Sequence, residues 1–485
     1  MINKEGRIIR IIFVFLVITL LPEYRLYAAT RIPENIMISV DGGEAGTVRA
    51  INASYDNNIY ISLRDTAFLM AESNSPINVE VTDRSANITV GEKYSDEFLH
   101  EGWSLESLKQ SAGGDPGNAA LSVNGEERRY YTILAGIDGY FDCFISPMDL
   151  AMILDISMDT DDQGNILIET SSNFIINPAR MESNDYFDGF NTVVVGDATT
   201  GEVFYGYNYE EAYPIASTTK LMTYLITMDA IADGTITPDD KVVISKKAAD
   251  LSASSDGFVA LSEGWEIPIS ELILGALLPS SNECALSLAE YIAGSEKEFV
   301  ELMNKKCEEL QLKSANFHNS NGLPIFTESI IPAKTQNKMS GYDMFKMCSH
   351  ILNTYPQIKD ITSMKTAKMP TLNRNLKNTN LLLYNLPEVN GLKTGTTDRS
   401  GACLITSLTV PAEDGSHDIV VVTLGAENSQ ARLRVSELMA RYGINVIKGK
   451  ASKISYDIRA DEGIIREEMT SELIVRTVVD YVLRN

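Results

Sequence analysis

The protein has 485 residues, of which 44% are hydrophobic and 22% charged, and its 41 basic residues oppose 66 acidic ones for a formal net charge of −25. This composition is that of a globular protein, and the length predicts two or three domains because single cores stop growing at about 250–300 residues. The acidic balance argues against nucleic acid as a partner, since nucleic-acid-binding proteins need a basic face.

The histidine and cysteine residues show no metal-binding or disulfide pattern. The four histidines never pair at zinc spacing, and the five cysteines never form C-x-x-C. We therefore expect no metal, no other cofactor and no disulfide framework, and we expect small buried thiols instead.

The first 29 residues are predicted to be a signal peptide. Three basic side chains precede an apolar run over residues 11–21, and Ala28 and Ala29 follow it as a small-residue cleavage site. The run is about half of the ~20 residues that a membrane-spanning helix needs. The sequence therefore predicts a secreted, extracytoplasmic protein.

Residues 30–172 contain a weak internal repeat. ISVDG at 38–42 returns as LSVNG at 121–125, and YISLRDTA at 60–67 corresponds to FISPMDLA at 144–151. Each unit reads as a strand and turn, a second strand leading into a short helix, and a hairpin, which predicts a small α+β repeat domain. The pattern resembles the stalk-type repeat named after the N-terminal domain of copper amine oxidases. That resemblance implies a spacer or cell-wall-binding module, without copper because only His100 lies in the region.

Residues 186–445 are predicted to form the largest domain. A hairpin opens it, helical patterning covers residues 218–352, and strand patterning returns near its end. The predicted strands are Thr192–Asp197, Glu202–Tyr207, 390–396, 402–408 and 418–424. Strands at both ends with helices between them indicate one antiparallel sheet with helices on its faces and a helical subdomain.

Residues 446–485 carry apolar side chains at helical spacing. Such a stripe packs either on a membrane surface or on the protein itself. Acidic residues within the segment oppose anionic lipid, so packing on the protein is favoured and membrane association stays open.

The first candidate motif is Ser217-Thr218-Thr219-Lys220, followed by a helical pattern. No other lysine in the chain follows a serine at this spacing. At a helix start, Ser217 and Lys220 stand one turn apart on one face, where the dipole favours an alkoxide and disfavours an ammonium. A serine becomes nucleophilic when a base takes its proton, and a lysine of lowered pKa is such a base. The alternative is a helix-capping serine followed by a solvated lysine.

Two further motifs follow along the chain. Ser280-Ser281-Asn282 lies in a turn between two apolar helical stretches, where it would present a hydroxyl and an amide to a cleft. K-T-G occurs once, at Lys393, on a predicted strand. A lysine and threonine there would hold a carboxylate, the glycine would let a substrate backbone approach, and the positive charge would lower the pKa of Lys220.

The order S-x-x-K, S-x-N, K-T-G within one region is typical of active-site-serine enzymes that act on penicillin-like acyl groups and D-alanyl peptides. Residues 186–445 resemble the low-molecular-mass penicillin-binding proteins, the serine-type D-Ala-D-Ala carboxypeptidases of peptidase family S11. The stretches NFHNSNGL at 316–323 and NTNLL at 378–382 are also similar to that family. The resemblance implies a β-lactamase/DD-peptidase-like α+β fold.

The resemblance implies three catalytic residues. Ser217 would be the acylated nucleophile, Lys220 the general base, and Ser280 a proton relay. The substrate would be the peptidoglycan stem peptide, from which the enzyme removes the terminal D-alanine, and β-lactams would acylate the same serine. Cell-wall or cell-surface association through the N-terminal repeat would fit this role.

The resemblance also implies the substrate-binding residues. Asn282 would hold the substrate amide, and Lys393 with Thr394 the terminal carboxylate. Gly395 and Thr396 would continue the strand along which the peptide lies, and the backbone N–H of Thr396 would form the oxyanion hole with that of the nucleophile.

One departure from the family and two alternatives complete the sequence reading. The family's usual β-rich C-terminal domain has no counterpart in the 40 residues that follow residue 445. A serine β-lactamase shares two motifs and the fold, although no clear E-x-x-x-N deacylation element lies between residues 280 and 393. A non-catalytic wall-binding protein is the other alternative.

Overall fold

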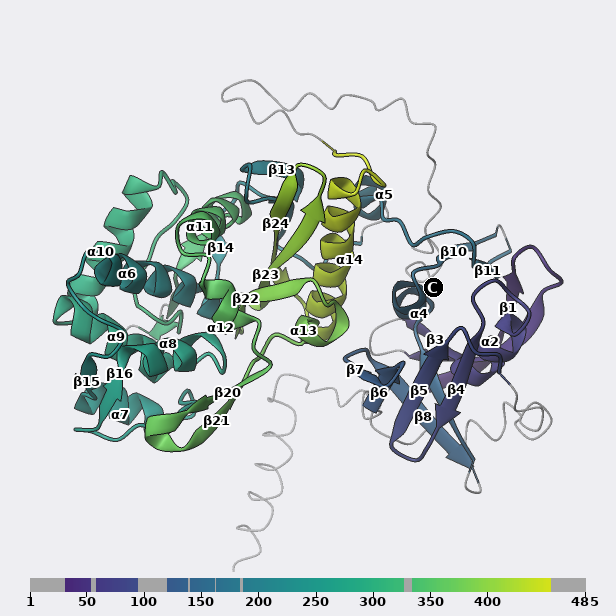
Figure 1. Ribbon diagram of the computed structural model, residues 1–485, viewed down its shortest axis with the longest axis horizontal. Helices are drawn as coiled ribbons and strands as arrows, with labels where there is room; N and C mark the ends of the chain where they lie inside the picture. Colours follow the sequence, from purple (N-terminus) through teal and green to yellow (C-terminus); the bar gives the residue numbers. More distant parts are fainter. Residues whose placement is uncertain are drawn as a thin grey trace, which may run out of the picture.

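The computed structural model describes residues 31–53, 58–94, 120–137, 140–161, 163–183, 186–326 and 334–454. Figure 1 shows two parts side by side, an N-terminal part (residues 31–183) and a C-terminal part (residues 186–454). The predicted signal peptide and residues 455–485 lie outside the described residues.

The N-terminal part is built from two sheets and short helices. One sheet has the order β10-β11-β1-β2-β3-β9-β8 and the other the order β4-β5-β6-β7. The elements are β1 (Arg31–Val40), β2 (Gly46–Ala53), β3 (Asn58–Ser62), α2 (Leu63–Met70), β4 (Ile77–Val81), β5 (Ser85–Val90), β6 (Ala120–Val123), β7 (Glu126–Arg128), β8 (Thr132–Ile137), β9 (Tyr140–Ile145), α4 (Pro147–Leu154), β10 (Ser157–Thr160), β11 (Ile166–Glu169) and α5 (Pro178–Ser183).

The two repeated units exchange strands with each other. β1 of the first unit pairs in parallel with β11 of the second, and β6 of the second pairs in parallel with β5 of the first. At the centre, β3 pairs antiparallel with its own counterpart β9. Each unit therefore completes the other's sheet, and neither unit closes its hydrogen-bond ladder alone.

The C-terminal part contains a five-stranded sheet and most of the helices. Its elements are β12 (Thr192–Asp197), β13 (Glu202–Tyr207), β14 (Tyr213–Pro214), the 3₁₀ helix η2 (Ala216–Thr219), α6 (Lys220–Ala232), β15 (Lys241–Val243), α7 (Lys246–Ala253), β16 (Glu266–Pro268), α8 (Ile269–Leu277), α9 (Asn282–Ala293), α10 (Glu296–Glu309), β17 (Ile325–Phe326), β18 (Lys334–Thr335), β19 (Lys338–Met339), α11 (Gly341–Thr354), α12 (Ile358–Thr362), β20 (Thr366–Met369), η3 (Pro370–Leu372), β21 (Arg374–Lys377), α13 (Leu382–Asn385), β22 (Val389–Thr397), β23 (Gly401–Ala412), β24 (Gly415–Ala426) and α14 (Ser429–Ile447).

The five-stranded sheet is antiparallel and has the order β13-β12-β24-β23-β22. The first two strands of the region thus pair with the last three, which confirms the predicted sheet assembled from both ends of the chain. β22, which carries the K-T-G motif, is an edge strand of this sheet.

The sheet separates two hydrophobic cores. Successive side chains of a strand point to opposite faces. Val193 and Val195 of β12 accordingly join the core that contains the apolar side of α14, whereas Val194 joins the core of the helices α6–α11. The candidate motifs lie on the second side, where the helical elements meet the edge strand β22.

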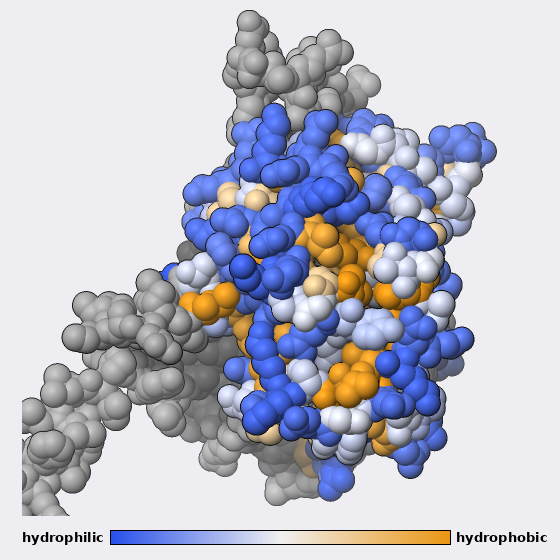
Figure 2. All heavy atoms as spheres, turned by 90° about the vertical axis from the view of Figure 1, so that its left-hand side faces the viewer, coloured by the Kyte–Doolittle hydropathy of each residue, from blue (hydrophilic) through white to orange (hydrophobic). Residues whose placement is uncertain are grey.

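The surface of the helical elements is mostly hydrophilic, with apolar side chains between the polar ones (Figure 2). Over the described ranges, no helix is both long and apolar enough to cross a bilayer. All five cysteines are buried and unpaired, which confirms the expectation of small buried thiols.

The two parts share one continuous hydrophobic cluster. Figure 1 shows α14 on the side of the five-stranded sheet that faces the N-terminal part. This helix runs to Ile447 and therefore crosses the predicted boundary between residues 445 and 446, because buried apolar side chains continue at Ile444 and Val446.

Candidate active site

The first motif lies at a helix start, as predicted, but its serine is in a 3₁₀ turn. Ser217 belongs to η2, and α6 begins at Lys220, which is also the C-terminal cap of η2. Ala216, just before the serine, has a positive φ of 46°, a conformation that is uncommon for a residue with a side chain. The tight turn and the following helix place Ser217 and Lys220 side by side.

The amine of Lys220 is the centre of the site. Lys220 is completely buried, and its Nζ lies 2.9 Å from Ser217 Oγ, 2.8 Å from Asn282 Oδ1 and 2.8 Å from the carbonyl oxygen of Asn321. Burial lowers the pKa of this lysine from 10.5 to about 7, because the charged form loses its hydration. Once neutral, Nζ can donate its two hydrogens to Asn282 and Asn321 and direct its lone pair at Ser217 Oγ.

The sequence predicts that the helix start and the charge of Lys393 together lower this pKa. Burial is the largest cause instead, and the neighbours Glu283 and Cys284 act to raise the pKa. The repulsion between the two lysines is seen at Lys393 instead. The pKa of Lys393 falls well below its usual value because of burial first, and then because of Lys220 and Arg432.

The second motif brings its asparagine into contact with Lys220. Ser281 caps α9, since its Oγ accepts from the backbone N–H of Cys284 at 3.0 Å, and Asn282 begins the helix. The cap therefore fixes the asparagine that contacts Lys220. Ser280 is 7% exposed with a φ of 68°, and among the described residues no hydrogen bond joins its hydroxyl to Ser217 or Lys220. Its relay role stays a prediction.

The third motif lies on β22 beside η2. Lys393 is 1% exposed, and its Nζ donates to the carbonyl of Thr394 at 2.8 Å. The hydroxyl of Thr394 lies 2.5 Å from that of Thr379, whose backbone N–H in turn donates to the carbonyl of Leu278 at 3.2 Å. Thr379 thus connects the K-T-G strand to the segment that carries Ser280 and Asn282.

Two glycines allow the backbone of Ala216 and Ser217 to lie between neighbouring segments. A Cβ on Gly395 would lie 2.9 Å from the backbone nitrogen of Ser217, and one on Gly322 would lie 2.0 Å from the carbonyl oxygen of Ala216. We expected Gly395 to make room for a substrate backbone. In the structure, the missing side chain of Gly395 makes room for the backbone of η2. Thr396 is the next residue of the same strand.

Three site residues escaped the sequence analysis. Asn321 accepts a hydrogen bond from Lys220 through its backbone carbonyl, which no side-chain pattern reveals. It lies in the stretch 316–323, which resembles the family. Arg432 on α14 lies 3.4 Å from Thr396 Oγ1 and adds a second buried cation near Lys393. Glu283 follows the second motif directly but resembles an ordinary acidic residue in the first turn of a helix.

Glu283 holds the wall of the site next to Asn282. It is completely buried, and its Oε1 accepts from the backbone N–H groups of Phe258 and Val259. Asn282 Nδ2 donates to the carbonyl of Asp256 in the same loop at 2.8 Å. The loop that precedes residue 260 is thus fastened to the start of α9.

We expect Glu283→Gln to move the acid limb of the acylation rate to lower pH. The negative charge of Glu283 raises the pKa of Lys220, so removing it lowers that pKa and leaves more neutral lysine at a given pH. The rate of acylation by a labelled penicillin, measured from pH 5 to 9, checks this. Glu301→Gln, on the exposed side of α10, is the control, and an unshifted or upward-shifted limb in Glu283→Gln would contradict the assignment.

The described side chains around Ser217 are not arranged to hold a metal ion. Within the described ranges, no group of three or more histidine, cysteine, aspartate or glutamate side chains is arranged to hold a metal ion. The polar groups around Ser217 are an amine, amides and hydroxyls, which suit proton transfer and hydrogen bonding.

The fold and the Ser217–Lys220–Asn282 cluster are those of the active-site-serine class, with a serine hydroxyl and a buried amine side by side at one helix start. Comparison with protein families and curated sequences narrows this class. Residues 184–428 match the peptidase S11 model, described as D-alanyl-D-alanine carboxypeptidase. The chain belongs to this family.

Two similar curated proteins carry the same description. The chain is 34% identical over 247 residues to the D-alanyl-D-alanine carboxypeptidase DacF of Bacillus subtilis, a match that covers 50% of this chain and 58% of the relative. It is 32% identical over 255 residues to DacD of Escherichia coli, with 52% and 62% covered. A crystal structure from Streptococcus pneumoniae, described as a peptidoglycan synthesis regulatory factor (PBP3), is similar with a TM-score of 0.48 and 30% identity, over 52% of this chain and 73% of that one. The matches to DacF and DacD thus span about six tenths of those two relatives.

Proposed function

We propose that the protein is a serine D-Ala-D-Ala carboxypeptidase that removes the terminal D-alanine from peptidoglycan stem peptides. One observation carries the proposal: a buried amine with a pKa of about 7 lies 2.9 Å from Ser217 Oγ and is held by Asn282 and Asn321. Such an amine is uncharged in a large fraction of molecules at neutral pH, which a general base requires.

The reaction proceeds by acyl transfer. Neutral Lys220 takes the proton of Ser217 as Oγ bonds to the carbonyl carbon between the two D-alanines. The carbon–nitrogen bond then breaks, and the amine of the terminal D-alanine leaves with a proton. Water attacks the resulting ester and restores the serine hydroxyl. Backbone N–H groups of Ser217 and Thr396 hold the oxyanion, an interaction that usually contributes a few kcal/mol.

The edge strand β22 supports the binding mode. Because β22 has a free side in the described five-stranded sheet, an extended stem peptide can add to it as a further strand. Its terminal carboxylate then meets Thr394 and the buried Lys393, with Arg432 nearby. A carboxylate beside Lys393 favours its charged form and so offsets the lowered pKa of that lysine.

The proposal is tested by D-alanine release from a diacyl-L-Lys-D-Ala-D-Ala peptide, together with its C-terminal amide. We expect the acid to be preferred by about 100-fold in kcat/KM, because a charge-assisted hydrogen bond to a carboxylate is worth roughly 1.5–3 kcal/mol. Lys393→Met should remove most of that preference by slowing the acid and leaving the amide nearly unchanged.

The controls separate this outcome from general damage. Lys365→Met removes an exposed lysine whose Nζ lies over the ring of Tyr384, and it should keep the preference for the acid. No release of D-alanine by the wild type, with cell-wall binding retained, would favour the non-catalytic alternative. Rapid turnover of benzylpenicillin in place of a long-lived adduct would favour a β-lactamase.

We also infer that the enzyme works outside the cytoplasm. The basic, apolar and small-residue pattern of residues 1–29 supports export, and stem peptides are found in the wall. Binding of the N-terminal part to the cell wall and inhibition by β-lactams belong to the same proposal.

A further inference from the structure

The two units of the N-terminal part each bury an aspartate at the same position. Ser62 caps α2 and Ser146 caps α4, and in each unit the serine hydroxyl accepts from the backbone N–H of the aspartate three residues later, at 3.0 and 3.1 Å. These aspartates, Asp65 and Asp149, are only 4% and 3% exposed. A carboxylate so buried needs a positive or hydrogen-bonding partner.

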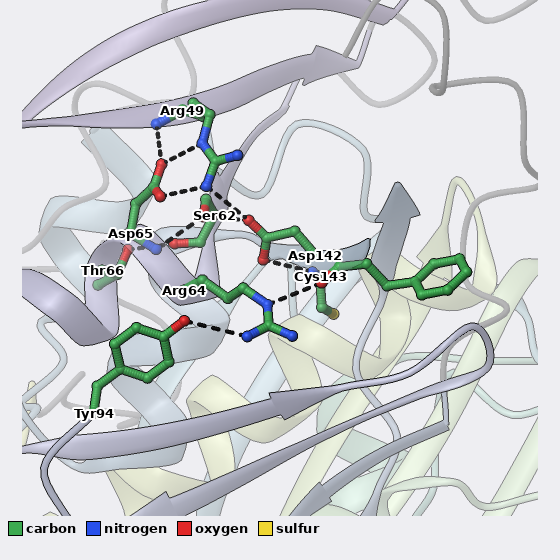
Figure 3. Close-up of polar contacts among 9 residues, drawn as sticks. Arg49, Ser62, Arg64, Asp65, Thr66, Tyr94, Asp142 and Cys143 are labelled. Atoms are coloured by element: carbon green, nitrogen blue, oxygen red, sulfur yellow. Dashed lines mark hydrogen bonds and ion pairs between the residues drawn. The ribbon is translucent and has the colours of Figure 1, made fainter. Parts of the chain in front are cut away.

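The first unit supplies this partner from its own strand. Arg49 of β2 donates to Asp65 Oδ2 from its backbone nitrogen at 2.9 Å and from Nε at 2.7 Å, and its Nη2 pairs with Oδ1 (Figure 3). Nη2 also lies 3.3 Å from Asp142, which accepts from Ser62 Oγ at 2.6 Å. Figure 3 shows these groups converging where β3 of the first unit meets β9 of the second, which carries Asp142.

The second unit has no arginine at the equivalent place. In the first unit Ile61 of β3 pairs with Ala50, and in the second unit its counterpart Ile145 pairs with Thr132. The residue before Thr132 therefore corresponds to the arginine of the first unit, and that residue is Tyr131. A tyrosine supplies no positive charge.

The missing arginine comes from the C-terminal part. Arg434 on α14 donates from Nε and Nη2 to the two carboxylate oxygens of Asp149, both at 3.1 Å, and the two side chains are 16% and 4% exposed. The same two side-chain nitrogens of Arg49 bind Asp65. We propose that Arg434 completes the second repeat unit and thereby locks the N-terminal and C-terminal parts into one body.

Further polar contacts surround this ion pair. Glu437, one turn along α14, accepts from the hydroxyl of Tyr130 at 2.6 Å and from Asn385 Nδ2 at 3.0 Å. Asn385 also exchanges two hydrogen bonds with the backbone of Arg129, at 2.6 and 3.2 Å. The interface is therefore specific, and it includes α13 as well as α14.

The Arg434–Asp149 ion pair also influences β22, the strand that binds substrate in the proposed function, on which this inference rests. α13 ends four residues before β22 begins, and it packs on both β22 and β7. On α14, Arg432 lies two residues before Arg434 and reaches Thr396 Oγ1 at 3.4 Å. The N-terminal part thus contacts two elements that reach β22, α13 and α14, which pack in the same hydrophobic core. Arg434 is therefore a positioning residue for the carboxylate-binding end of the site.

The test uses the full chain with Arg434→Met, and Lys359→Met as its matched control. Lys359 also forms a partly buried ion pair, with Asp418 at 2.7 Å, but within the C-terminal part alone. We expect Arg434→Met to increase the radius of gyration in solution scattering and to split one thermal transition into two. The control should do neither. A variant as compact and as cooperative as the control would overturn the lock, whether or not the protein is an enzyme.

Kinetics test the positioning role separately. Lys393 and Thr394 lie on β22, whereas the nucleophile and base lie on η2 and α6. Arg434→Met should therefore raise KM for the D-Ala-D-Ala peptide about tenfold and lower kcat less, by about two- to threefold, through the N–H of Thr396 on the same strand. A loosened protein with unchanged KM would refute the positioning role, and an equal fall of kcat would indicate general damage instead.

A rescue distinguishes the borrowed arginine from a chance salt bridge. Tyr131→Arg, added to Arg434→Met, supplies an internal arginine where the first unit has one. We expect the N-terminal transition to return to its wild-type temperature while the molecule stays extended and KM stays high. Failure of the N-terminal transition to recover, or recovery of the compact shape, would contradict the equivalence of the two arginines.

Discussion

Ser217→Ala is expected to abolish both D-alanine release and penicillin labelling, as the proposed mechanism requires. The variant removes the only atom that forms the acyl bond, and loss of a catalytic serine in other hydrolases costs up to about 10⁶-fold in kcat. We expect a loss of at least about 10⁴-fold, measured by release of D-alanine, and no mass increase after benzylpenicillin. The fold should be retained, because Ser217 is partly exposed and its hydroxyl contacts only the amine of Lys220 among the described residues.

The control is Thr218→Ser. Thr218 is the next residue of η2, and its hydroxyl donates to the carbonyl of Ile215 at 2.6 Å, so this change keeps the hydroxyl of the turn. It should retain the adduct. An adduct of equal yield on Ser217→Ala and wild type would show that another residue is the nucleophile.

The second large effect is expected at Lys220. Only the neutral amine accepts the proton of Ser217, so kcat/KM should rise with pH through about 7 and level off above it. Lys220→Arg should lower the acylation rate by about 10³-fold, because a guanidinium stays protonated across this range and general-base catalysis contributes roughly 10²–10⁴-fold. Stopped-flow acylation between pH 5.5 and 9 measures both.

The pH profile also discriminates between mechanisms. If Lys220 acted as a cation that stabilises charge, activity would fall as pH rises through about 7, and Lys220→Arg would remain active. Either result would exclude the lysine as base. Lys346→Arg, a partly exposed lysine on α11, is the control for the arginine substitution itself and should leave the rate unchanged.

The chemistry of the site was largely predictable from local patterns. The spacing of Ser217 and Lys220, the S-x-N turn and the single K-T-G strand each lie within a few consecutive residues, so their secondary structure follows from short-range rules. The antiparallel sheet assembled from both ends was predictable for the same reason, since alternating apolar runs mark strands wherever they occur in the chain.

Contacts between distant residues were not predictable. Lys220 and Asn321 are 101 positions apart, and the contact uses a backbone carbonyl, which every residue possesses. Arg434 and Asp149 are 285 positions apart, and each resembles an ordinary surface charge in the sequence. The pKa of Lys220 likewise depends on burial, which no local pattern reports.

The amino-acid sequence by itself therefore determined the family motifs, the candidate site residues within them and the segments that repeat, because motifs and periodicities are local. Only the tertiary structure decided that Asn321 and Glu283 complete the site, that burial sets the pKa of Lys220, and that α14 supplies an arginine to the N-terminal part. These features arise when packing excludes water and brings together groups that are far apart in the chain. The interaction free energy of such a pair depends on both groups and cannot be assigned to either residue alone.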